Sequence, residues 1–238
     1  MEENIYRGLS VVLPAFNEEE SIGRCVEDIS KHLKSLPFRS FEVIVVDDGS
    51  TDSTPRIVDE LAQTNPQLRV IHHSENLGYA VALRDGFAAA SQPLIFYTDS
   101  DNQFDIRELG LLLDLIGDND IVTGFRVYRF DPLTRLFLSW GFNLLVRIIF
   151  RIKVKDIDCA FKLFKREALE NIHIESRRFF VDAEILAKAR YLGYRMVEVP
   201  VRHYPRQAGR STVRPSHIPW TLFELAKMWV RIYLQKKI

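Results

Sequence analysis

Two acidic turns contain the residues whose types and spacing most clearly suggest chemistry. Residues 47–52 are Asp-Asp-Gly-Ser-Thr-Asp and residues 99–103 are Asp-Ser-Asp-Asn-Gln, and each turn directly follows a short apolar run. Such runs are typical of buried strands. Ligands of open α/β sheets bind outside the carboxyl ends of the strands, so we expect both turns to line one crevice. Either turn alone would also fit an ordinary helix cap, but the two together favour a binding site.

The second turn has the donor atoms of a divalent-cation site. Asp99 and Asp101 stand at alternate positions, so both carboxylates can face one point, and Gln103 adds an amide oxygen. Carboxylates this close repel each other unless a cation or hydrogen-bond donors compensate. Oxygen ligands suit Mg²⁺ or Mn²⁺, which keep positions open for the phosphates of a nucleotide. We therefore predict a Mg²⁺ or Mn²⁺ site at these three residues.

Alternating strands and helices are expected to position the two turns. Apolar runs predict strands over residues 9–13 (ended by Pro14), 41–46, 68–72 and 94–97. Apolar residues at spacings of three and four predict helices between them, over residues 18–36, 57–62 and 78–90. This alternation indicates an α/β fold, doubly wound, in which a mostly parallel sheet is covered by helices on both faces.

The second half of the chain has a less regular pattern. We expect helices over residues 133–150, 179–192 and 220–237, a strand over 194–199 closed by Pro200, and a polar, basic loop over 202–219. Because no linker or repeat interrupts the 238 residues, we expect a single domain over 1–238. Cys25 and Cys159 are too few and too isolated for a disulfide framework, which favours two free thiols in a reducing compartment.

Charge is distributed unevenly along the chain. Residues 1–122 contain 22 acidic and 9 basic side chains, a net charge of −13, whereas residues 123–238 carry a net +13. This division suggests an acidic half that holds a metal ion and a basic half that faces phosphates or an anionic surface. His72 and His73 lack further ligands at metal-binding spacing, so we expect them to be structural or solvent-exposed.

Four motifs, taken in order, closely resemble those of the family 2 glycosyltransferases. They are Pro14-Ala15-Phe16-Asn17-Glu18, Asp47-Asp48-Gly49-Ser50, Asn76-Leu77-Gly78-Tyr79 and Asp99-Ser100-Asp101-Asn102-Gln103. Within that family the chain looks like the dolichyl- or polyprenyl-phosphate mannose or glucose synthases. The resemblance covers roughly residues 8–215. It implies a GT-A fold, in which a Rossmann-like half (8–122) binds a nucleotide sugar, an acceptor-binding half (123–215) follows, and an amphipathic helix (216–238) ends the chain.

The resemblance also implies roles for individual residues on the donor side. The segment from Pro14 to Glu18 would contact the base and ribose, and Asp47 or Asp48 would read the base, with the choice between them open. Gly78 and Ser100 would complete the nucleotide-sugar site. Residues 206–211 resemble a basic loop that closes over the diphosphate, which assigns Arg206, Arg210 and Ser211 to the donor phosphates.

On the acceptor side the resemblance points to two further motifs. Arg126 ends a Gly-x-Arg motif whose arginine meets phosphate, and Arg129 is a second candidate for the acceptor phosphate. Residues 156–161 resemble an Asp-x-x-x-Gly-Phe motif, although Ala160 stands where glycine is usual. The implied catalytic residues are thus Asp99, Asp101, Arg126, Asp156 and Arg206.

These assignments suggest an inverting, metal-dependent transfer of mannose or glucose from GDP-mannose or UDP-glucose to a polyprenyl or dolichyl phosphate. An anionic phosphate acceptor needs arginines more than a general base. A sugar-hydroxyl acceptor would instead require a carboxylate base, for which Asp156 or Asp158 could serve. A non-catalytic nucleotide-sugar- or membrane-binding module is the alternative from another class. A dehydrogenase is disfavoured because no Gly-x-Gly-x-x-Gly follows the first strand, and nucleic-acid reader motifs are absent.

Two amphipathic helices suggest where the protein works. Helices 133–150 and 220–237 combine aromatic and aliphatic residues with Arg or Lys, as helices lying in a membrane interface do. Packing of these faces against the core or a second subunit is the alternative. The run from 136 to 150 is too short to span a bilayer. We therefore expect a peripheral enzyme at the cytoplasmic membrane face, with no transmembrane helix in this chain, and a second copy or a membrane protein as a candidate partner.

Overall fold

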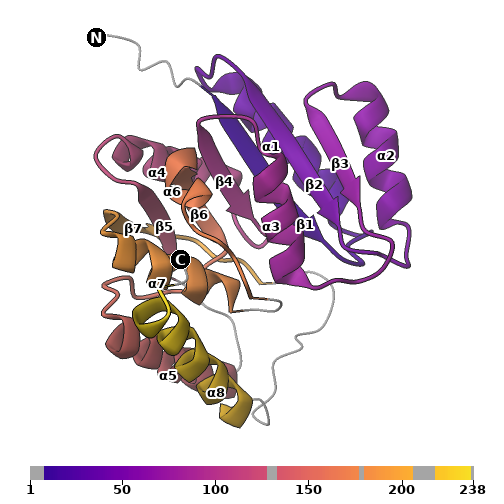
Figure 1. Ribbon diagram of the computed structural model, residues 1–238. Coiled ribbons are helices and arrows are strands. Elements are labelled where there is room, and N and C mark those ends of the chain that lie inside the picture. The colour runs from indigo at the N-terminus through magenta and orange to yellow at the C-terminus, as the bar shows by residue number, and fades with distance from the viewer. Residues whose placement is uncertain (1–7, 128–132, 177–179, 206–217, 237–238) are drawn as a thin grey trace.

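A seven-stranded sheet runs through the molecule in the computed structural model, which describes residues 8–127, 133–176, 180–205 and 218–236 (Figure 1). In the sheet the strands stand in the order β3-β2-β1-β4-β6-β5-β7. All neighbouring strands are parallel except β6, which runs antiparallel to both β4 and β5. The strands are β1 (Leu9–Ala15), β2 (Phe41–Asp47), β3 (Leu68–His72), β4 (Leu94–Thr98), β5 (Ile121–Arg126), β6 (Phe161–Lys165) and β7 (Met196–Val201).

Helices cover both faces of this sheet, as the sequence predicts. One core cluster joins the sheet to α1 (Ile22–Ser35), α2 (Thr54–Thr64) and α4 (Leu109–Ile116). The other joins it to α3 (Tyr79–Ala89), α5 (Leu133–Phe150), α6 (Arg166–Glu170), α7 (Val181–Leu192) and α8 (Ile218–Trp229). Successive residues of β1 divide between the two clusters, Val12 in one and Val11 and Leu13 in the other, because side chains alternate across a strand.

Proline does not end strands β1 and β7, contrary to the prediction. Strand β1 continues through Pro14 to Ala15, where Pro14 pairs with Val46 of β2. The pairing of β1 with β4 ends earlier, at Val12. The missing N–H of Pro14 therefore removes no hydrogen bond between β1 and β4. Strand β7 includes Pro200 and runs to Val201. It is the edge strand of the sheet, where a missing backbone N–H is tolerated.

The sequence interpretation also missed several elements from residue 106 onward. These are the short 3-10 helix η1 (Ile106–Glu108), α4, β5, β6 and α6. The last predicted helix is divided, because α8 passes into a single π-helical turn, η3 (Val230–Leu234). The remaining predicted helices and strands are present with ends shifted by a few residues, and the helix over 133–150 is confirmed as α5.

Helices α5 and α8 lie side by side at one end of the molecule, away from β1, β2 and β3 (Figure 1). Large apolar side chains on them are exposed to solvent: Phe137, Trp140, Leu144, Leu145, Ile148, Leu222, Phe223 and Trp229, here called the α5–α8 apolar surface. Among the described residues, no helix combines the length and the apolar character needed to cross a bilayer.

Candidate active site

The carboxyl ends of β1, β2 and β4 bring the two acidic turns to one edge of the sheet. Ala15 at the end of β1 pairs with Asp47 at the end of β2, and the three strands are parallel. The buried hydroxyl of Ser100 donates a hydrogen bond of 2.9 Å to the backbone carbonyl of Pro14, which fixes the turn after β4 against the end of β1. The two acidic turns that were expected to line one crevice therefore lie together at the ends of these three strands.

A second set of hydrogen bonds ties the loop after β1 to the loop after β2. Asn17 adopts a left-handed backbone conformation, with φ of 55°. Its backbone N–H donates to the Ser50 hydroxyl at 2.9 Å, and its side-chain oxygen accepts from the Thr51 N–H at 2.8 Å. Neighbouring Phe16 is 44% exposed, so its ring is available to a ligand at the rim of the crevice.

Both Asp47 and Asp48 are buried, and their oxygens already have protein partners. Asp47 accepts from the Ser50 N–H at 3.1 Å and from the His72 ring at 2.8 Å. Asp48 accepts from the His73 ring at 2.7 Å and from the backbone N–H groups of Leu77 and Gly78, at 2.9 and 2.8 Å. Whether Asp47 or Asp48 contacts the base of the nucleotide therefore stays open. The two histidines have a structural role, each bonded to one of these carboxylates.

The predicted cation residues cluster at the end of β4. The half-buried Asp99 accepts a hydrogen bond of 3.0 Å from the Tyr79 hydroxyl at the start of α3. Burial, and secondarily the charge of Asp101, raise the pKa of Asp99 from 3.8 to about 7. Asp101 accepts from the Gln103 N–H at 3.1 Å, and the Gln103 amide nitrogen donates to the Tyr204 carbonyl at 2.8 Å.

These donors fit a cation that shares its coordination with a nucleotide. Within the described part of the chain, no three His, Cys, Asp or Glu side chains form a cluster that could hold a metal ion alone. A carboxyl group whose pKa is raised by burial and by a neighbouring carboxylate is nevertheless suited to a cation that replaces the proton. Mg²⁺ is commonly held by one or two carboxylates, substrate phosphates and water. Asp99 and Asp101, with the amide oxygen of Gln103, match that pattern.

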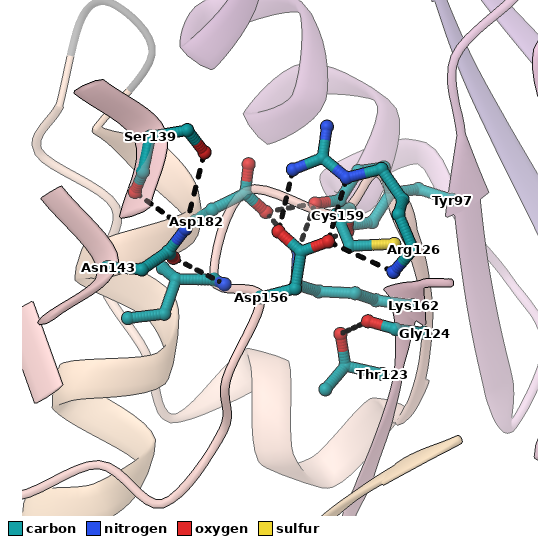
Figure 2. A network of polar contacts seen from close by, with 11 residues as sticks. Tyr97, Thr123, Gly124, Arg126, Ser139, Asn143, Asp156, Cys159, Lys162 and Asp182 are labelled. Atoms are coloured by element: carbon teal, nitrogen blue, oxygen red, sulfur yellow. Dashed lines mark hydrogen bonds and ion pairs between the residues drawn. The ribbon is translucent and has the colours of Figure 1, made fainter. Parts of the chain in front are cut away.

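The predicted acceptor arginine forms an ion pair with the predicted base (Figure 2). Nε and Nη2 of Arg126 donate to the two carboxylate oxygens of Asp156 at 2.7 and 2.6 Å, and the Arg126 N–H adds a third bond at 3.0 Å. Both side chains are about nine-tenths buried. Asp156 is therefore a fixed partner of Arg126 in this structure, which makes it a poor general base.

Asp158, two residues further on, has a different environment. It is half-buried, and no hydrogen bond or ion pair to its carboxylate is seen among the described residues. Burial, followed by the charge of Asp182, raises the pKa of Asp158 from 3.8 to about 7. A carboxyl group whose pKa lies near neutrality has a property that a general acid or base requires.

Lys162 and Asp182, whose charges act on Asp158, belong to a buried polar network that the sequence interpretation missed. Figure 2 shows this network. Lys162, fully buried on β6, donates to Asp182 at 2.7 Å, to the Tyr97 hydroxyl at 3.0 Å and to the carbonyl of Cys159. Tyr97 also donates to Asp182, which lies in the first turn of α7. The network joins β4, β6 and α7 directly behind the acidic turn at Asp99.

Four of the predicted site residues cannot be placed. Arg129, Arg206, Arg210 and Ser211 lie outside the described residues.

Comparison with known proteins identifies the family. Residues 10–173 match the family model described as Glycosyl transferase family 2. The chain belongs to glycosyl transferase family 2.

Two relatives and one structural neighbour illustrate the match. Glycosyltransferase AglD of Haloferax volcanii is 38% identical over 208 residues, covering 83% of this chain and 33% of the relative. A dolichyl-phosphate beta-glucosyltransferase of Dictyostelium discoideum is 32% identical over 222 residues, covering 84% of this chain and 66% of the relative. The chain thus spans between a third and two thirds of these two proteins. The solved glucosyl-3-phosphoglycerate synthase of Mycobacterium tuberculosis, in complex with Mn²⁺, UDP and phosphoglyceric acid, superposes with a TM-score of 0.68 at 23% identity, over 95% of this chain and 76% of that one.

In this glycosyltransferase the GT-A-like fold expected from the resemblance is confirmed by the seven-stranded sheet and its structural neighbours. The glycosyl transferase family 2 domain, shared with relatives named as glycosyltransferases, favours an enzyme over the alternative of a non-catalytic binding module. Of the residues that sequence reasoning missed, Lys162 had a recognisable signal, since a lysine between Phe161 and Leu163 interrupts an apolar strand pattern. The only sequence signal for Asp182 was its position in the first turn of a helix. Acidic residues are also favoured there on exposed helices, so this position does not indicate a buried network.

Proposed function

We propose that the chain transfers a hexose, mannose or glucose, from a nucleotide sugar to the phosphate of a polyprenyl or dolichyl lipid, with inversion at the anomeric carbon. The observation that carries the proposal is the Arg126–Asp156 pair, which fixes a buried arginine beside the acidic turn while leaving Asp156 unsuitable as a base. The Dictyostelium relative, named for a dolichyl-phosphate acceptor, supports the same choice.

On the donor side, we infer that the crevice between β1, β2 and β4 holds a nucleotide such as GDP or UDP. Phe16 is exposed at its rim, and the segment from Pro14 to Glu18 forms one wall. Asp99, Asp101 and Gln103 would hold Mg²⁺ or Mn²⁺. When bound, the cation supplies electrostatic stabilisation of the negative charge that develops on the diphosphate leaving group. The solved neighbour with Mn²⁺ and UDP is consistent with this assignment.

The transfer itself needs no strong base. An oxygen of the lipid phosphate attacks the anomeric carbon from the face opposite the diphosphate, and the carbon–oxygen bond to the diphosphate breaks. The bonding electron pair leaves with the nucleoside diphosphate, while the lipid phosphate changes from a monoester to a diester. Because the attacking oxygen is already anionic, the enzyme's task is to hold two anions close together. Arg126 remains charged, since its pKa is raised by the Asp156 partner against the effect of burial, and would provide that attraction on the acceptor side.

A second acceptor class is supported by Asp158. Its carboxyl group has no protein partner among the described residues and a pKa of about 7. Such a group could remove the proton from a sugar hydroxyl, as transfer to a polysaccharide or a glycolipid would require. In that reading Asp158 is the catalytic base and Asp156 only positions Arg126.

We further propose that the protein binds the cytoplasmic face of a membrane as a peripheral enzyme. The α5–α8 apolar surface exposes Phe137 to 70%, Trp140 to 60% and Phe223 to 63% of their areas. Exposed Arg151 and Lys227 lie on or beside the same two helices, which matches an interface with anionic lipids. A lipid-phosphate acceptor would be presented at such an interface.

Transfer assays with matched acceptors test the proposal. Purified protein with Mn²⁺ and labelled GDP-mannose or UDP-glucose is incubated with a polyprenyl phosphate or, as control, the same polyprenol without phosphate. We expect label in the organic phase only with the phosphate. Label on neither lipid with either donor, together with transfer to a soluble saccharide, would overturn the lipid-phosphate acceptor in favour of the hydroxyl acceptor.

A further inference from the structure

Two adjacent histidines at the end of β3 each bridge two carboxylates. The ring of His72 lies between Asp47 and Asp59, and the ring of His73 lies between Asp48 and Asp85. Adjacent residues of an extended chain point to opposite faces of a sheet. Asp59 belongs to α2 on one face and Asp85 to α3 on the other, so the two bridges diverge from one strand end.

His72 makes two well-formed charge-assisted hydrogen bonds. Nδ1 donates to Asp47 at 2.8 Å and Nε2 donates to Asp59 at 3.1 Å, so both bonds exist together only when both ring nitrogens carry protons. The charged groups that face this ring are Asp47 at the end of β2 and Asp59 on α2. Their hydrogen bonds raise the pKa of His72 above its ordinary value, outweighing the effect of burial. The imidazolium form is thereby favoured.

A continuous chain of bonds leads from His72 to the loop after β1. Asp47, held by His72 through one oxygen, accepts the Ser50 N–H with the other. The Ser50 hydroxyl in turn accepts the backbone N–H of Asn17. Asn17 is the left-handed residue that turns the chain between Phe16 and Glu18, so its orientation sets the wall of the proposed nucleotide crevice.

The second histidine leads to the other side of the crevice. His73, whose side chain is 7% exposed, donates to Asp48, and Asp48 accepts the N–H groups of Leu77 and Gly78. Gly78, with φ of 99°, immediately precedes α3. The next residue, Tyr79, donates its hydroxyl to Asp99. The path from His73 therefore ends at a proposed cation ligand.

We propose that His72 and His73 are positioning residues of the donor-nucleotide site, His72 for the loop after β1 and His73 for the start of α3. This inference rests on the proposed function, because it assumes that the crevice binds a nucleotide diphosphate. The inference goes beyond that function because it says that His72 and His73, which would not touch the donor, determine the conformation of the loop after β1 and of the start of α3. It also implies that the loop after β1 is held best while His72 is protonated.

Nucleotide affinity across pH tests the proposal. The affinity of the full chain for UDP and for GDP is measured by calorimetry with Mn²⁺ from pH 6 to 9, for wild type, His72→Asn, Asp59→Asn and the double variant. The asparagine at position 72 can still donate to Asp47 but cannot reach Asp59. His173→Asn is the matched control, since His173 is exposed and its side chain takes no part in either path.

Relative to His72→Asn, we expect the wild-type affinity to fall as pH rises through the pKa of His72, because deprotonation of Asp99 affects cation binding equally in both proteins. His72→Asn should bind about fivefold more weakly at pH 6.5, in keeping with one net hydrogen bond, and should show no such fall. Asp59→Asn should move the fall to lower pH, and the double variant should resemble His72→Asn. The control should match wild type. If wild type binds UDP or GDP but His72→Asn has the same affinity and pH profile, the histidine proposal is wrong. If neither nucleotide binds wild type, the donor-site assignment itself is wrong.

Discussion

Replacing Lys162 by methionine tests what the buried network behind Asp99 contributes to the fold. The substitution keeps a long apolar side chain but removes the ammonium group that donates to Asp182 and Tyr97. Asp182 would be left in the interior with the Tyr97 hydroxyl as its remaining donor in the network. Removing one partner of a buried ion pair costs about 3–5 kcal/mol. For a domain of this size each kcal/mol corresponds to ~2–4 °C, so we expect Tm to fall by roughly 6–20 °C.

Urea and thermal unfolding, followed by circular dichroism, measure this loss. Lys165→Met is the matched control, because Lys165 lies on the same strand, is about one-third exposed and stands 3.7 Å from Asp120. A partly exposed pair contributes at most about 1 kcal/mol. The double variant Lys162→Met with Asp182→Leu removes both charges and should recover much of the loss. The reasoning is refuted if Lys162→Met unfolds within 1 kcal/mol of the Lys165→Met control.

Three further predictions concern packing, the cation and the membrane. Gly86→Ala places a Cβ 2.4 Å from the Val12 side chain of β1, so it should lower the free energy of unfolding by about 1–3 kcal/mol. In Gly110→Ala on α4 the new Cβ meets nothing within 4 Å, so this substitution should raise the free energy of unfolding by about 0.5–1 kcal/mol. Urea unfolding measures both. Mn²⁺ with UDP or GDP at ~100 times Kd should add ~2.7 kcal/mol, a Tm rise of about 5–11 °C in a thermal-shift assay that EDTA reverses; no rise with either nucleotide would count against the donor site. Trp140→Glu with Phe223→Glu should abolish co-sedimentation with anionic vesicles, while Leu111→Glu, at an exposed position of α4, should leave it unchanged. Equal binding by wild type and both variants would contradict the α5–α8 apolar surface as the contact.

The donor half could be predicted because its signals are local. Strands such as β2 are continuous runs of β-branched residues, and each is followed within a few residues by the turn that carries the chemistry. Parallel strands then force the turns at Asp47 and Asp99 to the same edge, so position follows from pattern. The histidine bonds that hold Asp47 and Asp48 come from the end of β3, 25 residues away, and no local pattern reveals them.

The acceptor half resisted prediction because its pairings join distant segments. Strand β6 has the sequence Phe-Lys-Leu-Phe-Lys, in which two lysines hide the apolar pattern of a central strand. It inserts antiparallel between β4 and β5, which no alternation of strands and helices would suggest. The partners Arg126 and Asp156 are likewise 30 residues apart. Sequence identified both as site residues through resemblance, but their pairing with each other depends on where β6 lies.

The acidic residues around the site divide into two groups with different consequences. Asp156 and Asp182 are neutralised by Arg126 and Lys162. Asp99 and Asp158 are not, and both have a pKa raised to about 7. Raised pKa values mean that ionising these groups costs folding free energy. Their contribution to stability is fully present below about pH 4, near the ordinary pKa of 3.8, and is lost as pH rises to about 7. A cation bound at Asp99 would remove this cost there, whereas no partner for the Asp158 carboxylate is seen in the part of the chain that the structure describes.

The pH dependence of transfer therefore separates the two acceptor classes at Asp158. A lipid phosphate beside it repels the carboxylate but accepts a hydrogen bond from the neutral acid, so transfer to phosphate should decline as pH rises above 7. A hydroxyl acceptor needs the carboxylate as base, so its transfer rate should instead increase over the same range. Asp158→Asn resembles the neutral acid: it should keep most activity toward a phosphate with a flattened pH profile, and lose activity toward a hydroxyl by at least about a hundredfold. Deprotonation of Asp99, the proposed cation ligand, would be shared by wild type and Asp158→Asn. If activity rises at alkaline pH in wild type, and both the rise and the activity are lost in Asp158→Asn, then Asp158 must lose its proton before it acts. That result would refute the phosphate acceptor.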